Sequence, residues 1–409
     1  MNAPSGRSVT ATGWPIGLKV CSIIAVLVFV LNVTAALAAN TPQEQTHIDH
    51  VYSPGCNAVV FAQFPDLPDL FVGRQINVTD PSNGCKGQGW SLVLLQMDWA
   101  THRFQILRAI LKTPVSILDG SARIDSAYDP YIAKFNGEYW VAFECAGKGI
   151  IGSATCIGPF DPHQSGMDIS RTYVIVQGRS AVPNDKYRYS ASDPKLLTFR
   201  NRLYLYWTAI KSWVPAGISG HQWLSIAVRG MELTQEAGGR RLLWGARGGG
   251  PADAYDPSRN VEVWGGDPSD VRSNQTADMM SIMSIGDVIY ATAGVGGNTD
   301  SSPPPVTEPH PGCVVPDNKK EGCFRLAISW STTPLGVHVF NNNLAPERIL
   351  PANTQEYARL YKQPDGRLFI MGRFMKALPP TDLSRAVPEG IDFIPLPANS
   401  PIAEWMKRH

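Results

Sequence analysis

The chain has 409 residues, a formal net charge of +1 and 17% charged residues. This length can bury a full hydrophobic core, and the near-neutral balance gives no electrostatic reason to expect nucleic acid as a partner. The 37 Gly, 33 Pro and 11 Trp favour a β-rich protein with many tight turns.

The N-terminus has the pattern of an export signal. Basic residues precede the apolar run VCSIIAVLVFVL (20–31), and the small-residue sequence Ala-Leu-Ala follows at 36–38. The apolar run is shorter than the roughly 20 residues of a membrane span. We therefore expect a signal peptide in residues 1–39, one domain in residues 40–409, and a secreted or periplasmic location. An uncleaved membrane anchor is the alternative, and only then would a membrane be a partner.

Cysteine usage agrees with export. Six cysteines follow Cys21, and pairing neighbours in sequence gives three disulfides: Cys56 with Cys85, Cys145 with Cys156, and Cys313 with Cys323. Such bonds fit an oxidising compartment. Zinc binding is the rival interpretation, but the chain has no C-x-x-C and its eight His are scattered. We expect no metal and no cofactor.

Two stretches share one hairpin pattern. Residues 126–143 read SAYDPYIAKFNGEYWVAF, in which Asp-Pro precedes an apolar strand, the turn Asn136-Gly137 and an aromatic strand. Residues 187–210 read YRYSASDPKLLTFRNRLYLYWTAI, with the same order and a turn at Arg200-Asn201. Two copies of one pattern indicate a repeat.

Weaker copies occupy residues 79–96, 276–293 and 355–372. The acids at the heads of the five copies are Asp80, Asp129, Asp193, Asp278 and Glu356. Each unit has room for about four short strands, which is one blade of a β-propeller. The sequence therefore predicts an all-β, five-bladed β-propeller after the N-terminal signal segment. A β-sandwich or another two-sheet architecture is the alternative, because regularly spaced strands do not select a propeller alone.

The stretches YDPYIAKFNGEYWVAF (128–143) and SDPKLLTFRNRLYLYWT (192–208) resemble the five-bladed β-propeller glycoside hydrolases. The likeness is to glycoside hydrolase family 43 and its relatives, including arabinanases, xylosidases and arabinofuranosidases. This resemblance implies hydrolysis with inversion by a general base Asp, a general acid Glu and a further Asp that tunes the pKa of the acid. Some relatives carry a central calcium, but no calcium-loop spacing occurs in this chain.

The resemblance transfers to four candidate catalytic residues. Asp129 and Asp193 match the Asp-Pro positions and are predicted as the base and the tuning partner, in either order. The next repeat, where a Glu is expected, begins with Asp278. We therefore predict Glu356 as the first choice of acid and Asp278 as the second. Glu262, in a predicted loop before Asp278, is a weaker candidate.

Carbohydrate binding needs flat apolar faces and hydrogen-bond donors. Aromatic rings can cover a sugar ring, and arginine can bind hydroxyl or carboxylate groups. The predicted substrate-binding residues are Tyr128, Arg188, Tyr189, Trp213 and Arg359. The plainer alternative is that most aromatic side chains here fill the spaces between blades.

Each catalytic assignment also has a structural alternative. An Asp before Pro often caps a turn through its own backbone, and Glu144, beside Cys145, is interpreted as a residue at the end of a strand. The sequence predicts an exported glycoside hydrolase acting on a polysaccharide or oligosaccharide by carboxylate acid/base chemistry. The alternatives are an inactive carbohydrate-binding propeller of the cell envelope and a purely structural envelope protein.

Overall fold

The computed structural model divides into residues 1–46 and residues 47–409, and the described residues all lie in the second unit. They are 48–51, 58–78, 87–101, 103–117, 122–178, 190–214, 223–239, 241–244, 251–265, 275–297, 325–341, 356–375, 388–395, 404 and 406–408. The predicted signal segment and the disulfides Cys56–Cys85 and Cys313–Cys323 lie outside them. No helix within the described ranges is long and apolar enough to cross a membrane.

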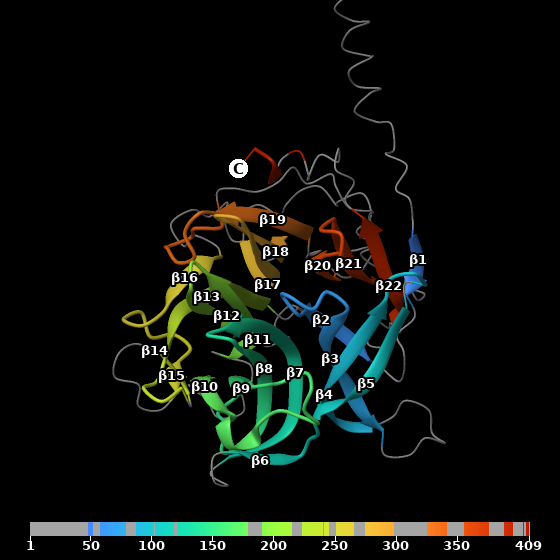
Figure 1. Ribbon diagram of the computed structural model, residues 1–409. Coiled ribbons are helices and arrows are strands. Elements are labelled where there is room, and N and C mark those ends of the chain that lie inside the picture. Colours follow the sequence, from blue (N-terminus) through green and yellow to red (C-terminus); the bar gives the residue numbers. More distant parts are fainter. Residues whose placement is uncertain are drawn as a thin grey trace, which may run out of the picture. The chain divides into compact units, whose positions relative to one another are not determined.

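The described strands form five sheets that follow one another along the chain (Figure 1). The first contains β2 (Val59–Gln63), β3 (Leu70–Val78), β4 (Gly87–Asp98) and β5 (Arg103–Leu111). The second contains β6 (Val115–Ile117), β7 (Ala122–Phe135), β8 (Glu138–Lys148), β9 (Ala154–Pro159), β10 (Tyr173–Gln177) and β15 (Ala252–Asp253). A short 3-10 helix, η3 (Ile169–Arg171), precedes β10.

The other three sheets complete the set. The third contains β11 (Ala191–Phe199), β12 (Arg202–Val214), β13 (Trp223–Gln235), β14 (Leu242–Trp244) and β16 (Val261–Trp264). The fourth contains β17 (Gln275–Ile285), β18 (Val288–Gly297) and β19 (Arg325–Ser331). The fifth contains β20 (Glu356–Lys362), β21 (Leu368–Met375), β22 (Pro388–Pro395) and β1 (Ile48–Val51).

One strand from each sheet faces the centre, and these five strands form a closed ring. In order, β2 packs beside β7, β7 beside β11, β11 beside β17, and β17 beside β20. The ring closes where the Tyr361 hydroxyl of β20 donates to the carbonyl of Phe61 in β2 over 2.6 Å. The first described strand, β1, pairs with the outer strand β22 of the last sheet. Ring and closure together make a five-bladed β-propeller, as the sequence predicts.

The predicted hairpins are confirmed. Asn136 and Gly137 both have positive φ (50° and 80°), as do Arg200 and Asn201 (49° and 59°), which is the backbone of the tight turn that matches strand twist. β7 pairs with β8 and β11 with β12 in antiparallel register across these turns.

The first repeat begins earlier than the sequence predicts. Asp80 follows β3, so it falls between the second and third strands of the first sheet, and the inner strand is β2. The β2 sequence VVFAQ has no acid, and the acid-based repeat therefore missed it.

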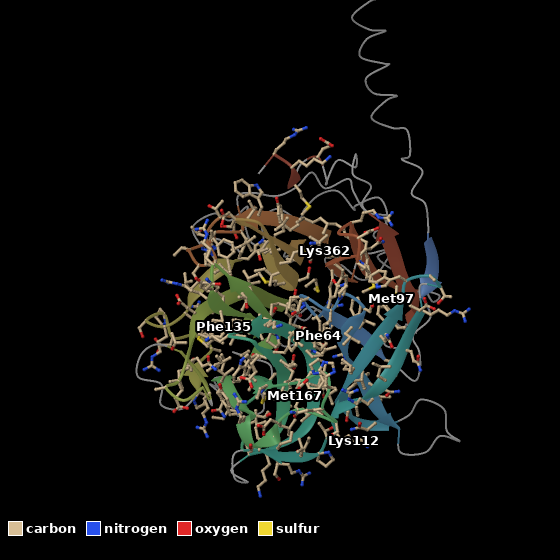
Figure 2. All side chains as sticks on the ribbon, in the orientation of Figure 1. Phe64, Met97, Lys112, Phe135, Met167 and Lys362 are labelled. Carbon is tan, nitrogen blue, oxygen red and sulfur yellow. A yellow bond between two sulfur atoms is a disulfide. The ribbon has the colours of Figure 1, made fainter. Side chains whose placement is uncertain are left out.

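Apolar side chains fill the spaces between neighbouring sheets, and Figure 2 labels four of them, Phe64, Met97, Phe135 and Met167. One large cluster includes Phe64, Phe135 and Met167, and a second, which includes Met97, joins the first sheet to the fifth. Trp140 and Trp207 lie on the return strands β8 and β12 of the two hairpins and are fully buried. These two tryptophans therefore fill the space between blades.

Candidate active site

A one-residue bulge recurs in each of the five inner strands. In β7 the register passes from Tyr128 to Tyr131 while the partner strand moves two residues, and β11 does the same between Ser192 and Lys195. Bulges re-aim side chains and are enriched beside active sites.

The two Asp-Pro acids occupy these bulges in the same conformation. Asp129 and Asp193 each have φ 46°, in the left-handed region that Asp tolerates better than most residues. The following proline disfavours the right-handed α region for the Asp, and by itself it favours extended backbone rather than this conformation. The repeated bulge, with Asp in the left-handed conformation, therefore presents a carboxylate near the centre of the ring.

Glu144 joins the two Asp residues. It lies opposite Tyr128 in the β7–β8 pairing, and its Oε2 atom lies 3.4 Å from the backbone N–H of Asp193. Its Oε1 atom accepts a hydrogen bond from the Ser153 hydroxyl. Carboxylate oxygens of Asp129, Glu144 and Asp193 all lie within 4.8 Å of one another.

Buried cations compensate this concentration of negative charge. Nη1 of Arg74, from β3, donates to Oδ1 of Asp129 over 2.6 Å. Lys195 is 1% exposed and donates from Nζ to the carbonyl of Asp193 over 2.7 Å. Arg359 is also buried, over the ring of Phe61. Like charges this close require such neighbours, since a buried uncompensated charge is costly.

The environment moves two pKa values in opposite directions. Burial raises the pKa of Asp129, but the charge of Arg74, a hydrogen bond with Asp193 and the charges of two further cations outweigh it, so the pKa is lowered. Burial, followed by the charge of Asp129, raises the pKa of Glu144 to about 7, although hydrogen bonds from Ser153 and Asp193 oppose the change. Glu144 can therefore hold a proton near neutral pH beside an ionised Asp129.

Aromatic rings form a wall beside Asp129. The Arg74 guanidinium lies 4.7 Å from the Trp90 ring centroid and 5.7 Å from that of Tyr128. The Trp90 and Tyr128 rings are 6.3 Å apart and tilted by 49°. Both residues are partly exposed, so the wall combines apolar faces with a cation and a carboxylate.

Oxygen ligands also suit hard cations such as Ca²⁺. Calcium takes about six to eight oxygens, whereas the described residues bring three carboxylates together here, beside Arg74. We assign no metal to the cluster.

The structure brings some predicted site residues together and leaves others undescribed. Asp129 and Asp193 lie in the acid cluster, and Tyr128 lies in the aromatic wall. Arg359 of β20 is buried against β2, and its charge lowers the pKa of Asp129. Asp278 and Glu356 lie in the inner strands β17 and β20, but their side chains lie outside the described residues. The same is true of the Trp213 side chain in β12, and of Arg188 and Tyr189 altogether.

Glu262 has a different position from the predicted loop. It lies in β16, which pairs with β13, and its Oε2 atom is 3.6 Å from Nη1 of Arg229. Both side chains are largely buried, at 13% and 11% exposure. Glu262 therefore serves an ion pair in the third sheet.

The sequence analysis missed Arg74 and Trp90, and it took Glu144 for a residue at the end of a strand, whereas Glu144 lies within β8. The register of the hairpin could have identified Glu144. Pairing residues outward from the Asn136-Gly137 turn without a bulge places Glu144 opposite Asp129, and the bulge shifts its partner to Tyr128. Arg74 and Trp90 come from the first sheet, and only the packing of that sheet against the second brings them to Asp129.

No family model and no curated protein matches the chain. Solved structures with a similar fold include the native Bacillus subtilis arabinanase, at 9% identity and TM-score 0.47, covering 86% of this chain and 97% of the other. A family 43 endo-arabinanase from Bacillus licheniformis matches at 10% identity and TM-score 0.45, covering 86% and 96%. A Cellvibrio cellulosa arabinanase complexed with arabinohexaose matches at 10% and 0.47, covering 86% and 93%.

Proposed function

We propose that this protein is an exported glycoside hydrolase that cleaves a polysaccharide or oligosaccharide. The carrying observation is the pair of neighbouring carboxyl groups whose pKa values move apart: Glu144 is raised to about 7 and Asp129 is lowered. Such a split is how one fold supplies an acid and a base together at neutral pH. Glu144 would protonate the leaving glycosidic oxygen, and Asp129 would act as the ionised partner.

The surroundings of the acid pair suit a sugar ring. Trp90 and Tyr128 offer partly exposed aromatic faces next to Asp129. Asp193 would tune Glu144, because its backbone N–H and its carboxylate both lie against that side chain. This assignment gives the acid role to Glu144 and leaves Glu356 and Asp278 as candidates for a further carboxylate.

Carboxyl spacing bears on the stereochemistry. One carboxylate oxygen of each acid lies within 4.8 Å of those of the other two, whereas the carboxyl groups of inverting glycosidases stand roughly 6.5–9.5 Å apart to leave room for a water. Inversion, which the sequence resemblance implies, would need a water-activating carboxylate farther from Glu144. Asp278 or Glu356 would supply it.

An inactive carbohydrate-binding propeller is the second candidate. It is favoured by the short bond from Arg74 to Asp129, which occupies one carboxylate oxygen and lowers the basicity of the group. Under this second candidate function, the aromatic wall of Trp90 and Tyr128 would bind a glycan and the acid cluster would not cleave it.

Hydrolysis by the purified protein tests the proposal. We would assay a panel of aryl glycosides and polysaccharides with the wild type, Glu144→Gln, Asp129→Asn and Asp193→Asn, with Asp287→Asn as a control at a side chain that is 81% exposed. Activity lost in the three cluster variants but kept in the control supports the proposal. Glycan binding without turnover on any substrate would move the assignment to the binding propeller.

A further inference from the structure

Ser153 lies where the second sheet meets the third. It directly precedes β9 and is 9% exposed. Its hydroxyl donates to Oε1 of Glu144. Its carbonyl accepts a hydrogen bond of 2.9 Å from the backbone N–H of Ala191, the first residue of β11.

These bonds and the contact between Glu144 and Asp193 connect Glu144, Ser153 and β11 in one network. Ala191 stands two residues before Asp193, and the N–H of Asp193 lies 3.4 Å from Oε2 of Glu144. Each oxygen of Glu144 thus faces a donor, one from the hairpin of the second sheet and one from β11 of the third. Ser153 contacts both the Glu144 carboxyl and β11.

A disulfide fixes the same hairpin. Cys145, directly after Glu144, is bonded to Cys156, three residues after Ser153, and both are fully buried. The bond closes a loop with a sequence separation of 11 residues. Thr155 adds a second tie, because its hydroxyl donates to the carbonyl of Ala191 over 3.0 Å.

We propose that Ser153 is a positioning residue of the candidate active site, which holds the Glu144 carboxyl and β11 in one fixed arrangement. This role rests on the proposed function of Glu144 as the acid. Ser153 would not touch the substrate; it acts through Glu144 and through the backbone that leads to Asp193.

The direction of the effect follows from the groups that face Glu144. Asp129 opposes ionisation of Glu144, whereas Arg74, the N–H of Asp193 and the Ser153 hydroxyl favour it. The Asp193 carboxylate also faces Glu144, within 4.8 Å. Lys195 and Arg359 act on the neighbouring Asp129. Removing the hydroxyl alone withdraws a donor to the carboxylate form and leaves the other groups in place, so Glu144 should keep its proton to higher pH.

The test compares Ser153→Ala with Ser153→Thr, which keeps a hydroxyl. Ser329→Ala is the matched control, since Ser329 is fully buried and donates to a backbone carbonyl away from the cluster. Rates would be measured as kcat and KM across pH. In parallel, infrared difference spectra would follow protonation of Glu144, with the band assigned by Glu144→Gln. Thermal unfolding checks that each variant is folded.

We expect Ser153→Ala to move the alkaline limb and the infrared titration up by about one pH unit. Its kcat should fall about tenfold with KM within about twofold, and Ser153→Thr should restore both. If Ser153→Ala titrates and turns over like the wild type, the positioning role is wrong. If no glycoside is cleaved by any variant, the infrared shift alone decides: a shift supports the positioning role although the proposed function has failed, and its absence overturns it.

Discussion

Nη1 of Arg74 lies 2.6 Å from Oδ1 of Asp129, and the two side chains come from different sheets of the propeller. Their exposures are only 16% and 9%, so solvent and salt screen the attraction little. The pair both neutralises the centre of the acid cluster and joins the first sheet to the second. Breaking it should therefore affect stability and chemistry together.

Arg74→Met should destabilise the protein by about 3 kcal/mol at neutral pH, because it leaves a buried carboxylate without its principal counter-charge. The lowered pKa of Asp129 contributes stability that is present above its ordinary value of 3.8 and is lost as pH falls through the folded value. The variant should therefore differ less from the wild type in acid. Urea unfolding near pH 7 and pH 3 measures this.

The control for that variant is Arg202→Met. Arg202 pairs with Glu232 at 3.3 Å, with exposures of 64% and 35%. An exposed pair of this kind contributes about 0–1 kcal/mol. Equal destabilisation by the two variants would contradict the importance given to the Arg74 pair.

Glu144→Gln should lower kcat by about 10² to 10⁴ while the protein stays folded, since positioned acid/base groups contribute this much. In the wild type, activity should fall as pH rises through about 7, the pKa of Glu144, because the protonated acid is lost. A pH profile of kcat on a cleaved glycoside checks both statements. An alkaline limb that persists in residual Glu144→Gln activity would assign that limb to another group.

The carboxyl group of Glu144 should also make the free energy of unfolding depend on pH. Glu144 has a folded pKa of about 7 against an ordinary value of 4.5, so the folded state holds this proton more tightly than the unfolded state. Its contribution to stability is therefore fully present below about 4.5 and is lost as pH rises to about 7. Urea unfolding between these pH values should show a decline that is weaker in Glu144→Gln. Identical pH dependence in the two proteins would argue against the raised pKa.

Local signals predicted the propeller well. The turns at Asn136-Gly137 and Arg200-Asn201 depend on residues that are adjacent in sequence, and each turn fixes one hairpin. Asp129 and Asp193 repeat because the same bulge repeats. The first sheet was misplaced because β2 shares the ring position of the other inner strands without sharing their acid.

Contacts between residues far apart in the sequence limited how much of the site could be predicted from the sequence. Glu144 could have been placed by register, since it lies on the return strand of the Asp129 hairpin. Arg74 comes 55 residues before Asp129, and no periodicity connects them. Which cation neutralises which acid depends on how neighbouring sheets pack, and that is settled by the apolar side chains between them.

A final prediction concerns Tyr131 of β7, which bonds to β17, the next inner strand but one in the ring, across 151 residues of sequence. Its hydroxyl donates to the carbonyl of Ile282 over 2.7 Å and accepts from the N–H of the same residue over 2.9 Å. Burial raises the pKa of Tyr131 to about 12, so the hydroxyl remains a donor across the usual pH range. Tyr131→Phe should cost about 2 kcal/mol, because two buried backbone groups lose their partner.

Tyr361→Phe provides the comparison. The Tyr361 hydroxyl donates to one backbone group, the carbonyl of Phe61, and the loss of that bond should cost about 1 kcal/mol. Urea unfolding of the two variants and the double variant would show whether the two losses in stability add, as expected for hydrogen bonds at separate places in the ring. A Tyr131→Phe protein as stable as the wild type would mean that the packing of neighbouring inner strands, rather than this hydroxyl, holds β7 and β17 in place.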